Sequence, residues 1–329
     1  MVKQKHKTIG LRKSLAIFAV AISIIIPVYN RESLLPRTLD SVYAQTYRPI
    51  ELIVVDNGST DGSRDAAEAW MKERQSNDFK TILADESQKG AARAREKGFS
   101  LASSDMVMFF DSDDIMLPTL CERVMDCLRL RPNTDMLYWP LVYGTEVAGE
   151  PWKRKKRFSS HNLLRRHIIN GPFSTLSYAV KASYLRRCGG WDTMLTGWDD
   201  WELGLRLLLN NPEIRRIDEP LAVVYPQEES ITGTDFSSKR GEWERAIEHM
   251  EHDIRKQPEP LRSRLTGLLL YRRVNLAALY KKEGNEEAAA GLLKESLDMA
   301  QEPRWRKLLL RLIYHYTSHG GRCGYLLWH

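Results

Sequence analysis

Short apolar runs alternate with helical segments along the N-terminal part of the chain. Runs of strand length cover residues 22–27, 50–55, 81–83 and 106–110, and between them apolar side chains recur every three or four positions. The runs are apolar almost throughout, as in strands that are covered on both faces. Repetition of strand and helix in this order predicts an α/β fold. We expect a Rossmann-like, mainly parallel sheet with right-handed crossovers and helices on its faces.

The pattern is looser after residue 114. Apolar spacing suggests a helix near 117–127, a strand at 136–141 and a last strand at 221–225. Between the two strands lies a basic stretch at 153–157, which we expect in a loop.

The first 21 residues combine basic side chains with the beginning of an apolar run. Five lysines and arginines between residues 3 and 13 precede the apolar run 15–26. This run is too short for a membrane-spanning helix, which needs about 20 apolar residues, and it continues without a small-residue cleavage site into Pro27. We therefore expect residues 1–21 to form a basic N-terminal tail rather than a secretion signal.

The composition changes after about residue 239, where helix-forming residues interrupted by prolines replace the earlier pattern. This change predicts a domain boundary near residue 235. The chain is accordingly divided into the N-terminal tail, an α/β domain at 22–235 and a helical C-terminal region at 236–329. Residues 276–290 resemble one helical hairpin of the tetratricopeptide type. Because a single repeat cannot build a solenoid, we expect a small helical appendage.

The overall charge favours anionic partners. The chain has 329 residues and a formal net charge of +6 at pH 7, so phosphorylated small molecules, anionic lipid and nucleic acid are all compatible with its surface. With 43% hydrophobic and 28% charged residues it has the composition of a globular protein, which excludes a disordered chain or a coiled coil. Its four cysteines are too few for a disulfide framework and lack the spacing of a structural zinc site, as expected for reduced thiols in the cytoplasm.

The first of three polar clusters is Asp56–Ser63, directly after the second apolar run. Its glycines let the backbone turn sharply and approach a ligand, and its side-chain oxygens can accept hydrogen bonds from the N–H groups of a base. The alternative is an Asx-rich turn that caps the helix starting near Arg64. The residues alone leave both interpretations open.

The second cluster is Phe109–Asp114, which places three carboxylates within four residues at the end of an apolar strand. These charges repel one another, and a divalent cation would remove the repulsion. Hard oxygen ligands of this kind suit Mg²⁺ or Mn²⁺, which commonly bridge to the phosphates of a substrate. The alternative is a solvated loop in which Asp114 caps the following helix.

The third cluster is Gly197–Glu202, at the start of an amphipathic segment. A carboxylate between tryptophans, close to a metal-bound diphosphate, could act as a general base toward a sugar hydroxyl, and desolvation by the indoles would raise its pKa. The alternative is an acidic first turn that complements the helix dipole. Taken by itself, this cluster fits the second interpretation better.

Taken together and in order, these clusters resemble glycosyltransferase family 2. The resemblance spans about residues 22–232 and is carried by five segments: 23–30, 54–63, 89–95, 111–114, and 189–192 with Asp199–Asp200. It implies a GT-A fold and an inverting enzyme that takes a nucleotide-sugar as donor. Processive synthases of this family have transmembrane helices, and no stretch of this sequence approaches transmembrane length, which favours a single transfer.

The resemblance also implies how the donor is bound. The implied donor-binding residues are Pro27, Tyr29 and Asn30 at the nucleotide pocket, Asp56 and Asn57 at the base, Arg93 near the diphosphate, and Asp111 at the ribose with Ser112 beside it. Asn57 stands where many members carry a second aspartate. Its amide can still accept a hydrogen bond from the imide of uracil or thymine, so a UDP- or dTDP-sugar is the favoured donor, although the choice of base is less defined.

For the reaction itself, the resemblance implies one metal-binding residue and one base. Asp113 would hold Mg²⁺ or Mn²⁺ through the donor diphosphate. Asp200 would remove the proton from the acceptor hydroxyl, with Asp199 in the neighbouring acidic position. The roles of Asp114 and Gln227 stay open. Gln227 occupies the place of the histidine in the family's His-x-x-Ser element, which leaves metal ligation from that side undecided.

Three other classes of protein are alternatives to an active glycosyltransferase. A catalytically inactive module that binds a nucleotide-sugar is the main alternative, in keeping with Gln227. A nicotinamide dehydrogenase does not fit, because no G-x-G-x-x-G motif follows the first strand. Nucleic acid is not an expected partner, because acidic clusters at the sheet edge would repel its phosphates.

The end of the chain has a composition of its own. Residues 304–329 contain five arginines and lysines, no acidic residue and several aromatic residues. Such a segment can lie on an anionic membrane, which would suit a lipid-linked acceptor, or it can pack on the catalytic domain as an ordinary helix. The expected acceptor is a glycan or a lipid-linked molecule. The expected location is the cytoplasm, with peripheral association at the inner face of the membrane left open.

Overall fold

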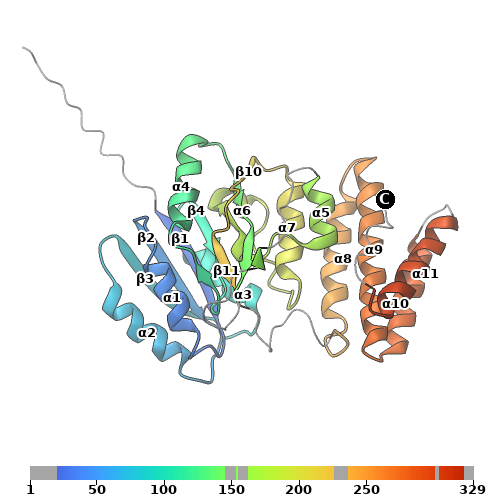
Figure 1. Ribbon diagram of the computed structural model, residues 1–329, viewed down its shortest axis with the longest axis horizontal. Helices are drawn as coiled ribbons and strands as arrows, with labels where there is room; N and C mark the ends of the chain where they lie inside the picture. The colour runs from blue at the N-terminus through green and yellow to red at the C-terminus, as the bar shows by residue number, and fades with distance from the viewer. Residues whose placement is uncertain (1–20, 145–152, 155–161, 226–235, 301–303, 322–329) are drawn as a thin grey trace, which may run out of the picture.

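The computed structural model describes residues 21–144, 153–154, 162–225, 236–300 and 304–321, and confirms the α/β architecture (Figure 1). Among these residues the central sheet has seven strands in the order β10–β6–β9–β4–β1–β2–β3. They are β1 (Ile22–Val28), β2 (Ile50–Asp56), β3 (Phe79–Asp85), β4 (Met106–Phe109), β6 (Met136–Tyr138), β9 (Tyr178–Lys181) and β10 (Ile214–Arg216). The first four strands run parallel, whereas β9 is antiparallel to both β4 and β6.

Helices cover both faces of this sheet. They are α1 (Leu35–Tyr43), α2 (Ser63–Arg74), α3 (Ala91–Leu101), α4 (Leu120–Leu130), α5 (Leu163–Asn170), α6 (Ala182–Arg187) and α7 (Asp199–Leu209), with a 3₁₀ turn at Thr175–Ser177. Ile24 and Ile26 of β1 face a core shared with α1, α2 and α4, whereas Ile25 faces a core shared with α3, α6 and α7. Because alternate residues of β1 enter two cores, the run is apolar throughout.

A smaller sheet lies beside the central one. Its order is β5–β11–β7–β8, and its strands are β5 (Ile115–Met116), β7 (Leu141–Tyr143), β8 (Lys153–Arg154) and β11 (Ala222–Val224). The stretch 136–141, which suggested one strand, is divided between β6 and β7, because Pro140 at the break has no N–H for a ladder hydrogen bond. The basic stretch expected in a loop begins with β8, and its residues 155–157 lie outside the described part.

The described part of the C-terminal region is helical, as predicted. Its helices are α8 (Glu242–Arg255), α9 (Leu261–Lys282), α10 (Glu286–Met299) and α11 (Arg304–Ser318). α9 and α10 form the expected hairpin, in which Gly284 turns the chain with φ +86°. Asn285 then caps α10, since its side chain accepts a hydrogen bond from the Ala288 N–H (3.1 Å).

The C-terminal helices share a hydrophobic core with α5 and α7, which lie between them and the sheet (Figure 1). This core contains Ile168 of α5, Trp201 of α7, Trp243 of α8 and Val274 of α9. The boundary near residue 235 falls outside the described part and stays a prediction, as does the N-terminal tail. Within the described ranges, no helix has both the length and the apolar character needed to cross a membrane.

Candidate active site

The carboxyl ends of β1, β2 and β4 lie side by side, because β1 pairs in parallel with both neighbours. Val28 of β1 is opposite Asp56 of β2, and Ile25 of β1 is opposite Phe109 of β4. The turns that follow these strands contain the first two polar clusters of the sequence. The sheet therefore brings both clusters to one edge, where α/β sheets commonly bind ligands.

Hydrogen bonds join the turn after β1 to the turn after β2. Asn30 Oδ1 accepts from the Thr60 N–H (2.8 Å), and the Arg31 N–H donates to Ser63 Oγ (2.7 Å). Asn30 has φ +51°, a left-handed conformation that asparagine tolerates better than most residues. The Asx-type turn is also present, because Asp61 Oδ1 accepts from the Ser63 N–H (3.0 Å). The two turns form one connected rim of the site.

Asp56 offers a free acceptor at this rim. Its Oδ2 accepts from the N–H groups of Gly58 and Ser59, each at 3.1 Å. Its Oδ1 is buried and has no hydrogen-bond partner among the described residues. A buried polar atom without a partner costs about 1–3 kcal/mol, so a ligand N–H that reached Oδ1 would be stabilised. Gly58 makes this turn possible with φ +73°.

Asn57 holds the segment before α3. Its Nδ2 donates to the carbonyls of Glu86 (2.9 Å) and Gln88 (2.8 Å), and its Oδ1 accepts from the Gly90 N–H (2.8 Å). Both amide hydrogens are therefore engaged within the protein. A contact between Asn57 and a base stays a prediction, and it would use the remaining lone pair of Oδ1.

Three further residues with predicted donor contacts lie at or near this rim. Tyr29 is exposed, and its hydroxyl accepts from Lys89 Nζ (2.8 Å). Pro27 is half-buried within β1, and Ser112 is buried in the turn after β4. Their contacts with a donor stay predictions.

Arg95 of α3 joins the second polar cluster to the third. Its Nη2 donates to Asp111 Oδ1 (2.9 Å) and its Nη1 to Asp199 Oδ2 (2.7 Å), while its Cζ lies 4.9 Å from the centroid of the Trp191 ring. Burial by itself lowers the pKa of Arg95, but the nearby carboxylates outweigh burial and raise it. Arg95 is thus a permanent cation between two of the acidic segments.

The sequence resemblance indicated Arg93 rather than Arg95 as the cation near the donor. Arg93 is half-buried and lines a shallow depression with Glu96 and Thr193, and its place near a diphosphate stays a prediction. The signal for Arg95 is its position on the apolar face of α3, beside buried Ala92 and Phe99. A charge on such a face requires a partner.

Asp200 lies in the first turn of α7 next to Asp199. Burial, together with the negative charge of Asp199, raises the pKa of Asp200 from 3.8 to about 7, although Arg95 opposes the shift. The carboxyl group therefore changes protonation near neutral pH, where a general base is most effective. This direction agrees with the expectation from the sequence that desolvation would raise the pKa.

Asp113 and Asp114 have different surroundings. Asp113 Oδ2 lies 3.3 Å from Arg31 Nε, and burial together with Asp111 raises the pKa of Asp113. Asp114 is buried, its Oδ1 accepts from the Tyr225 N–H (2.8 Å), and burial raises its pKa to about 8. The alternative in which Asp114 caps the following helix is wrong, because this carboxylate binds the chain just after β11 and not the N-terminus of α4.

The acidic groups at this edge are those predicted to hold a divalent cation. The negative charge of Asp111 helps to raise the pKa values of Asp113 and Asp114, so a cation placed among them would relieve repulsion. No group of three or more His, Cys, Asp or Glu side chains in the described ranges is suited to hold a metal ion by itself. An ion here would therefore need further oxygen ligands, such as phosphates. Gln227 lies outside the described residues.

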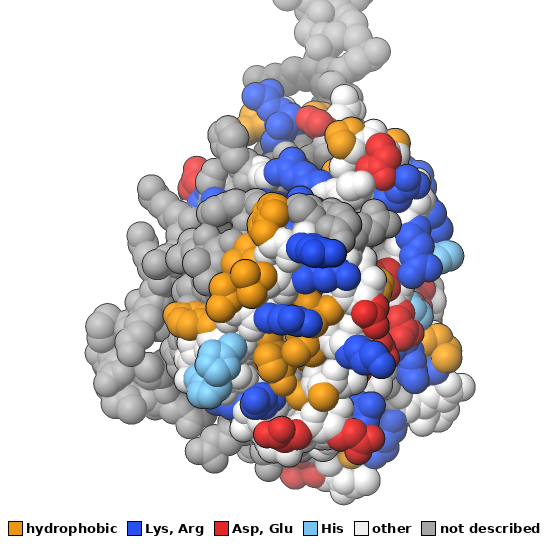
Figure 2. Space-filling model, turned by 90° about the vertical axis from the view of Figure 1, so that its right-hand side faces the viewer, with side chains coloured by type: hydrophobic (Ala, Val, Ile, Leu, Met, Phe, Trp, Pro, Cys, Tyr) orange, Lys and Arg blue, Asp and Glu red, His pale blue; other side chains and the backbone are white. Residues whose placement is uncertain are grey.

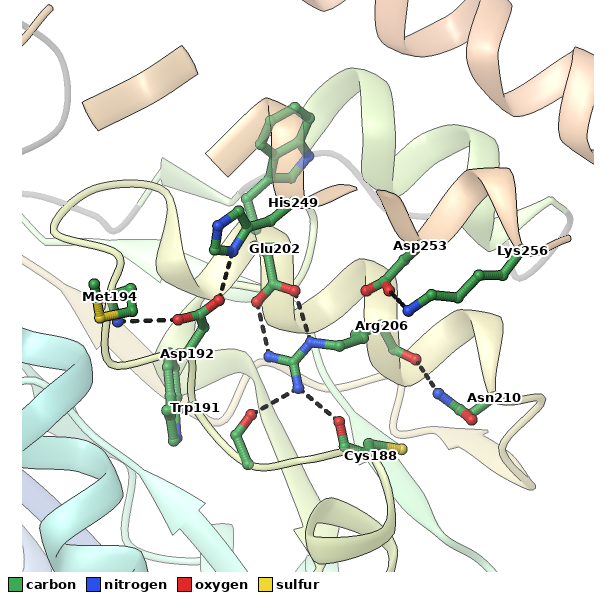
Figure 3. Close-up of polar contacts among 12 residues, drawn as sticks. Cys188, Trp191, Asp192, Met194, Glu202, Arg206, Asn210, His249, Asp253 and Lys256 are labelled. Atoms are coloured by element: carbon green, nitrogen blue, oxygen red, sulfur yellow. Dashed lines mark hydrogen bonds and ion pairs between the residues drawn. The ribbon is translucent and has the colours of Figure 1, made fainter. Parts of the chain in front are cut away.

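A polar network further along α7 holds the segment that carries Trp191 (Figure 3). Arg206 of α7 donates to two backbone carbonyls of residues 188–190 (2.6 and 2.9 Å), and Asp192 Oδ2 lies 2.6 Å from His249 Nδ1 of α8. These groups border a cavity of about 700 Å³. The network fixes Trp191 where its ring packs on the arginine of α3.

The comparisons with known sequences agree with this geometry. Residues 23–187, half of the chain, match the sequence model described as Glycosyl transferase family 2. An uncharacterized glycosyltransferase of Haemophilus influenzae is 28% identical over 225 residues, which are 67% of this chain and 69% of that relative. The matches to seven further curated relatives span only 13% to 51% of their lengths.

Solved structures show the same fold. S. aureus TarS 1–349 in complex with UDP-GlcNAc has a TM-score of 0.68 at 17% identity, covering 91% of this chain and 88% of that chain. Mannosyltransferase PcManGT from Pyrobaculum calidifontis in complex with GDP-Man and Mn²⁺ has a TM-score of 0.53 at 21% identity, covering 92% and 84%. The fold and the sequence relatives together define a glycosyltransferase with a GT-A fold. The chain belongs to glycosyltransferase family 2.

Proposed function

We propose that this enzyme transfers one sugar from a nucleoside-diphosphate sugar to a hydroxyl group of a glycan or a lipid-linked acceptor, with inversion at the anomeric carbon. The contacts of Arg95 carry the proposal. Arg95 joins Asp111, just after β4, to Asp199, the neighbour of Asp200. The predicted donor side and the predicted base thereby lie at one edge of the sheet. The two solved structures with nucleotide-sugars support a donor of the same class.

The donor base would bind at the rim formed by the turns after β1 and β2. The unpartnered Oδ1 of Asp56 would accept from an N–H group of the base, which is the imide N–H of uracil or thymine in the UDP- or dTDP-sugar favoured from the sequence. Tyr29 and Lys89 lie at the exposed side of this rim and would contact the nucleotide there.

The reaction would be a single displacement. Asp200 takes the proton from the acceptor hydroxyl, whose oxygen attacks the anomeric carbon from the face opposite the diphosphate. The bond between the anomeric carbon and the diphosphate oxygen breaks, and the nucleoside diphosphate leaves with the electron pair. Arg95 keeps Asp199 and Asp111 in place during this step. Mg²⁺ or Mn²⁺, held by Asp113 and the donor diphosphate, would supply positive charge for the leaving group.

The first experiment is a screen of the purified protein with Mn²⁺ against a panel of nucleotide-sugars, in which release of the nucleoside diphosphate is measured. We expect release with one donor or a few, and its increase when a suitable acceptor is added. Isothermal titration calorimetry on the same samples distinguishes the main alternative. Donor affinity without turnover, with every acceptor tested, would identify an inactive binding module.

Asp113→Ala is expected to weaken donor binding in the presence of Mn²⁺ to the level that the wild-type protein shows with EDTA. The reason is that the half-buried carboxylate is the predicted protein ligand of the ion. Donor affinity measured by calorimetry, with Mn²⁺ and with EDTA, checks this expectation. Wild-type affinity that is the same under both conditions would contradict the metal site.

We further propose that α11 contacts an anionic lipid surface, in keeping with a lipid-linked acceptor. One stripe of this helix exposes four large apolar side chains, although Leu310 and Ile313 pack inward; the exposed residues are Trp305, Leu308, Leu312 and Tyr316. The helix has several basic residues and no acidic one. Figure 2 shows hydrophobic and basic side chains next to one another on this side of the molecule. A second copy would bring like charges together, so anionic lipid is the partner that complements the surface.

The double variant Leu308→Ser/Leu312→Ser is expected to lose binding to vesicles that contain phosphatidylglycerol, measured by flotation. Leu130→Ser is the matched control, because Leu130 is 76% exposed on α4. Vesicles of phosphatidylcholine alone should bind weakly, since they lack the anionic charge. Equal flotation of the double variant and the wild type would remove the proposal. Loss of a dimer in light scattering, without vesicle binding, would instead identify a second copy as the partner.

A further inference from the structure

The backbone immediately before the predicted base has an unusual conformation. Trp198 precedes Asp199 and Asp200 and has φ +55°, a left-handed region that bulky side chains rarely occupy. Its carbonyl accepts the first hydrogen bond of α7 from the Glu202 N–H (2.9 Å). The direction in which both aspartates leave the helix end therefore depends on Trp198 keeping this conformation. Such strain persists only where the surroundings enforce it.

The Trp198 ring is packed among aromatic side chains from the C-terminal region. Its centroid lies 5.1 Å from that of Trp201 in α7 and 5.1 Å from that of Trp243 in α8. Trp243 is fully buried, and a Cβ at Gly197 would lie 2.4 Å from its ring. Gly197 thus lets α8 approach the start of α7 this closely.

Arg272 of α9 completes the surroundings of Trp198. Its Cζ lies 5.1 Å from the centroid of the Trp198 ring and 4.7 Å from that of Trp201, and its Nη1 donates to the Ile169 carbonyl (3.3 Å). Burial lowers the pKa of Arg272 to about 10, so it remains a cation at neutral pH. Two indole faces and one carbonyl thus stabilise a buried guanidinium. This arrangement connects α9 and α5 to the start of α7.

Trp201 is anchored from another side. Its indole N–H donates to the His167 carbonyl (2.8 Å), and its own carbonyl lies 2.7 Å from His167 Nε2. Trp201 therefore holds its place through α5, whereas Trp198 packs on Trp201 and on side chains of α8 and α9. Trp198, the residue that precedes the two aspartates, is therefore the residue whose position depends most on the C-terminal helices.

We propose that Arg272 and Trp243 are positioning residues that hold Trp198 in its left-handed conformation and thereby orient Asp200 for proton transfer. The C-terminal helices are then part of the catalytic machinery and not only a cover for α5 and α7. This inference rests on the proposed role of Asp200 as the general base.

Arg272→Met is expected to lower kcat about tenfold to a hundredfold, because a small displacement of a reacting group is costly. Donor affinity should stay within about twofold, since no donor contact is touched. The midpoint of the pH–kcat profile should shift, because the burial of Asp200 changes with its orientation. Arg272→Lys keeps the cation over the indoles and should recover part of kcat. Trp243→Phe should show the same pattern in weaker form.

Arg273→Met is the matched control. Arg273 is the next residue of α9 and is buried, but it pairs with Glu251 (3.0 Å) and Glu295 (3.1 Å) and not with Trp198. It should lower Tm at least as much as Arg272→Met while leaving kcat of the folded enzyme within about twofold.

The outcomes separate this inference from the proposed function. The positioning role would be overturned if Arg272→Met and Trp243→Phe kept the kcat and the pH midpoint of the wild type. It would also be overturned if kcat fell in these variants only as far as the loss of Tm explains, as judged against Arg273→Met. Asp200→Asn is measured in parallel. If Asp200→Asn keeps full turnover, the base assignment fails. If it is inactive while Arg272→Met and Trp243→Phe behave as wild type, only the positioning role fails.

Discussion

Asp200→Asn is expected to abolish sugar transfer and to leave donor affinity nearly unchanged. An asparagine has almost the same shape but cannot take a proton from the acceptor hydroxyl, and loss of a general base typically lowers the rate by about 10²–10⁴-fold. The groups predicted to bind the donor, Asp56 above all, lie on other segments and stay in place. The measurement is kcat with the donor found in the screen, together with the donor Kd from calorimetry.

The control for this substitution is Asp65→Asn, which removes one negative charge from the exposed first turn of α2 and should leave kcat unchanged. The wild-type pH profile gives a second check. Because the pKa of Asp200 is raised to about 7, the group is protonated below that pH and cannot act as a base. The wild-type kcat should therefore rise with pH through about 7. Full turnover by Asp200→Asn, or a flat profile across this range, would show that another group is the base.

The strands that could be predicted from the sequence are those whose burial produces a clear apolar pattern. β1 and β2 are buried on both faces, so nearly every residue is apolar. β10 was missed, because Ile214–Arg216 is a three-residue strand with two arginines and is the partly exposed edge strand of the sheet. β9 has only four residues and pairs antiparallel with β4 and β6. The sequence around it therefore lacks the strand–helix–strand pattern that marks a parallel strand. Short strands get their stability from neighbours that the local sequence does not reveal.

The same limit applies to the candidate site. Acidic residues at strand ends could be placed from the sequence, because parallel strands must bring their carboxyl ends together. Arg93 and Arg95 could not be distinguished by type, and only the helical face of α3 separates them. Trp198 was noted only as an indole beside the carboxylates, because the role proposed for it depends on a backbone conformation, on the Trp243 ring of α8 and on Arg272 of α9. Contacts between segments that are distant in the sequence cannot be predicted from such local patterns.

Arg95→Met is expected to destabilise the protein and to lower its kcat at neutral pH. The Arg95 side chain is 9% exposed, and its removal leaves Asp199 and Asp111 without their cation. Removing one partner of a buried ion pair typically costs about 3–5 kcal/mol, so Tm should fall clearly. Arg95 also lowers the pKa of Asp200, so the midpoint of the pH–kcat profile should move upward. From a pKa of about 7, the first unit of such a shift lowers the deprotonated fraction at pH 7 about fivefold, and each further unit lowers it about tenfold.

A double-mutant cycle separates the two effects of Arg95. In Arg95→Met/Asp199→Asn one of the two unpaired charges is gone, so Tm should recover partly relative to Arg95→Met alone, and the interaction should appear as non-additivity. The loss of Asp199 also removes a charge that raises the pKa of Asp200, so the pH midpoint should return toward about 7. Arg93→Met is the control on the same helix, expected to change donor affinity without moving Tm or the midpoint. Two results together would contradict this role of Arg95: changes in Tm that are additive in the double variant, and a pH–kcat midpoint that is unchanged in Arg95→Met. Arg95 would then not control the charge of the aspartates around it.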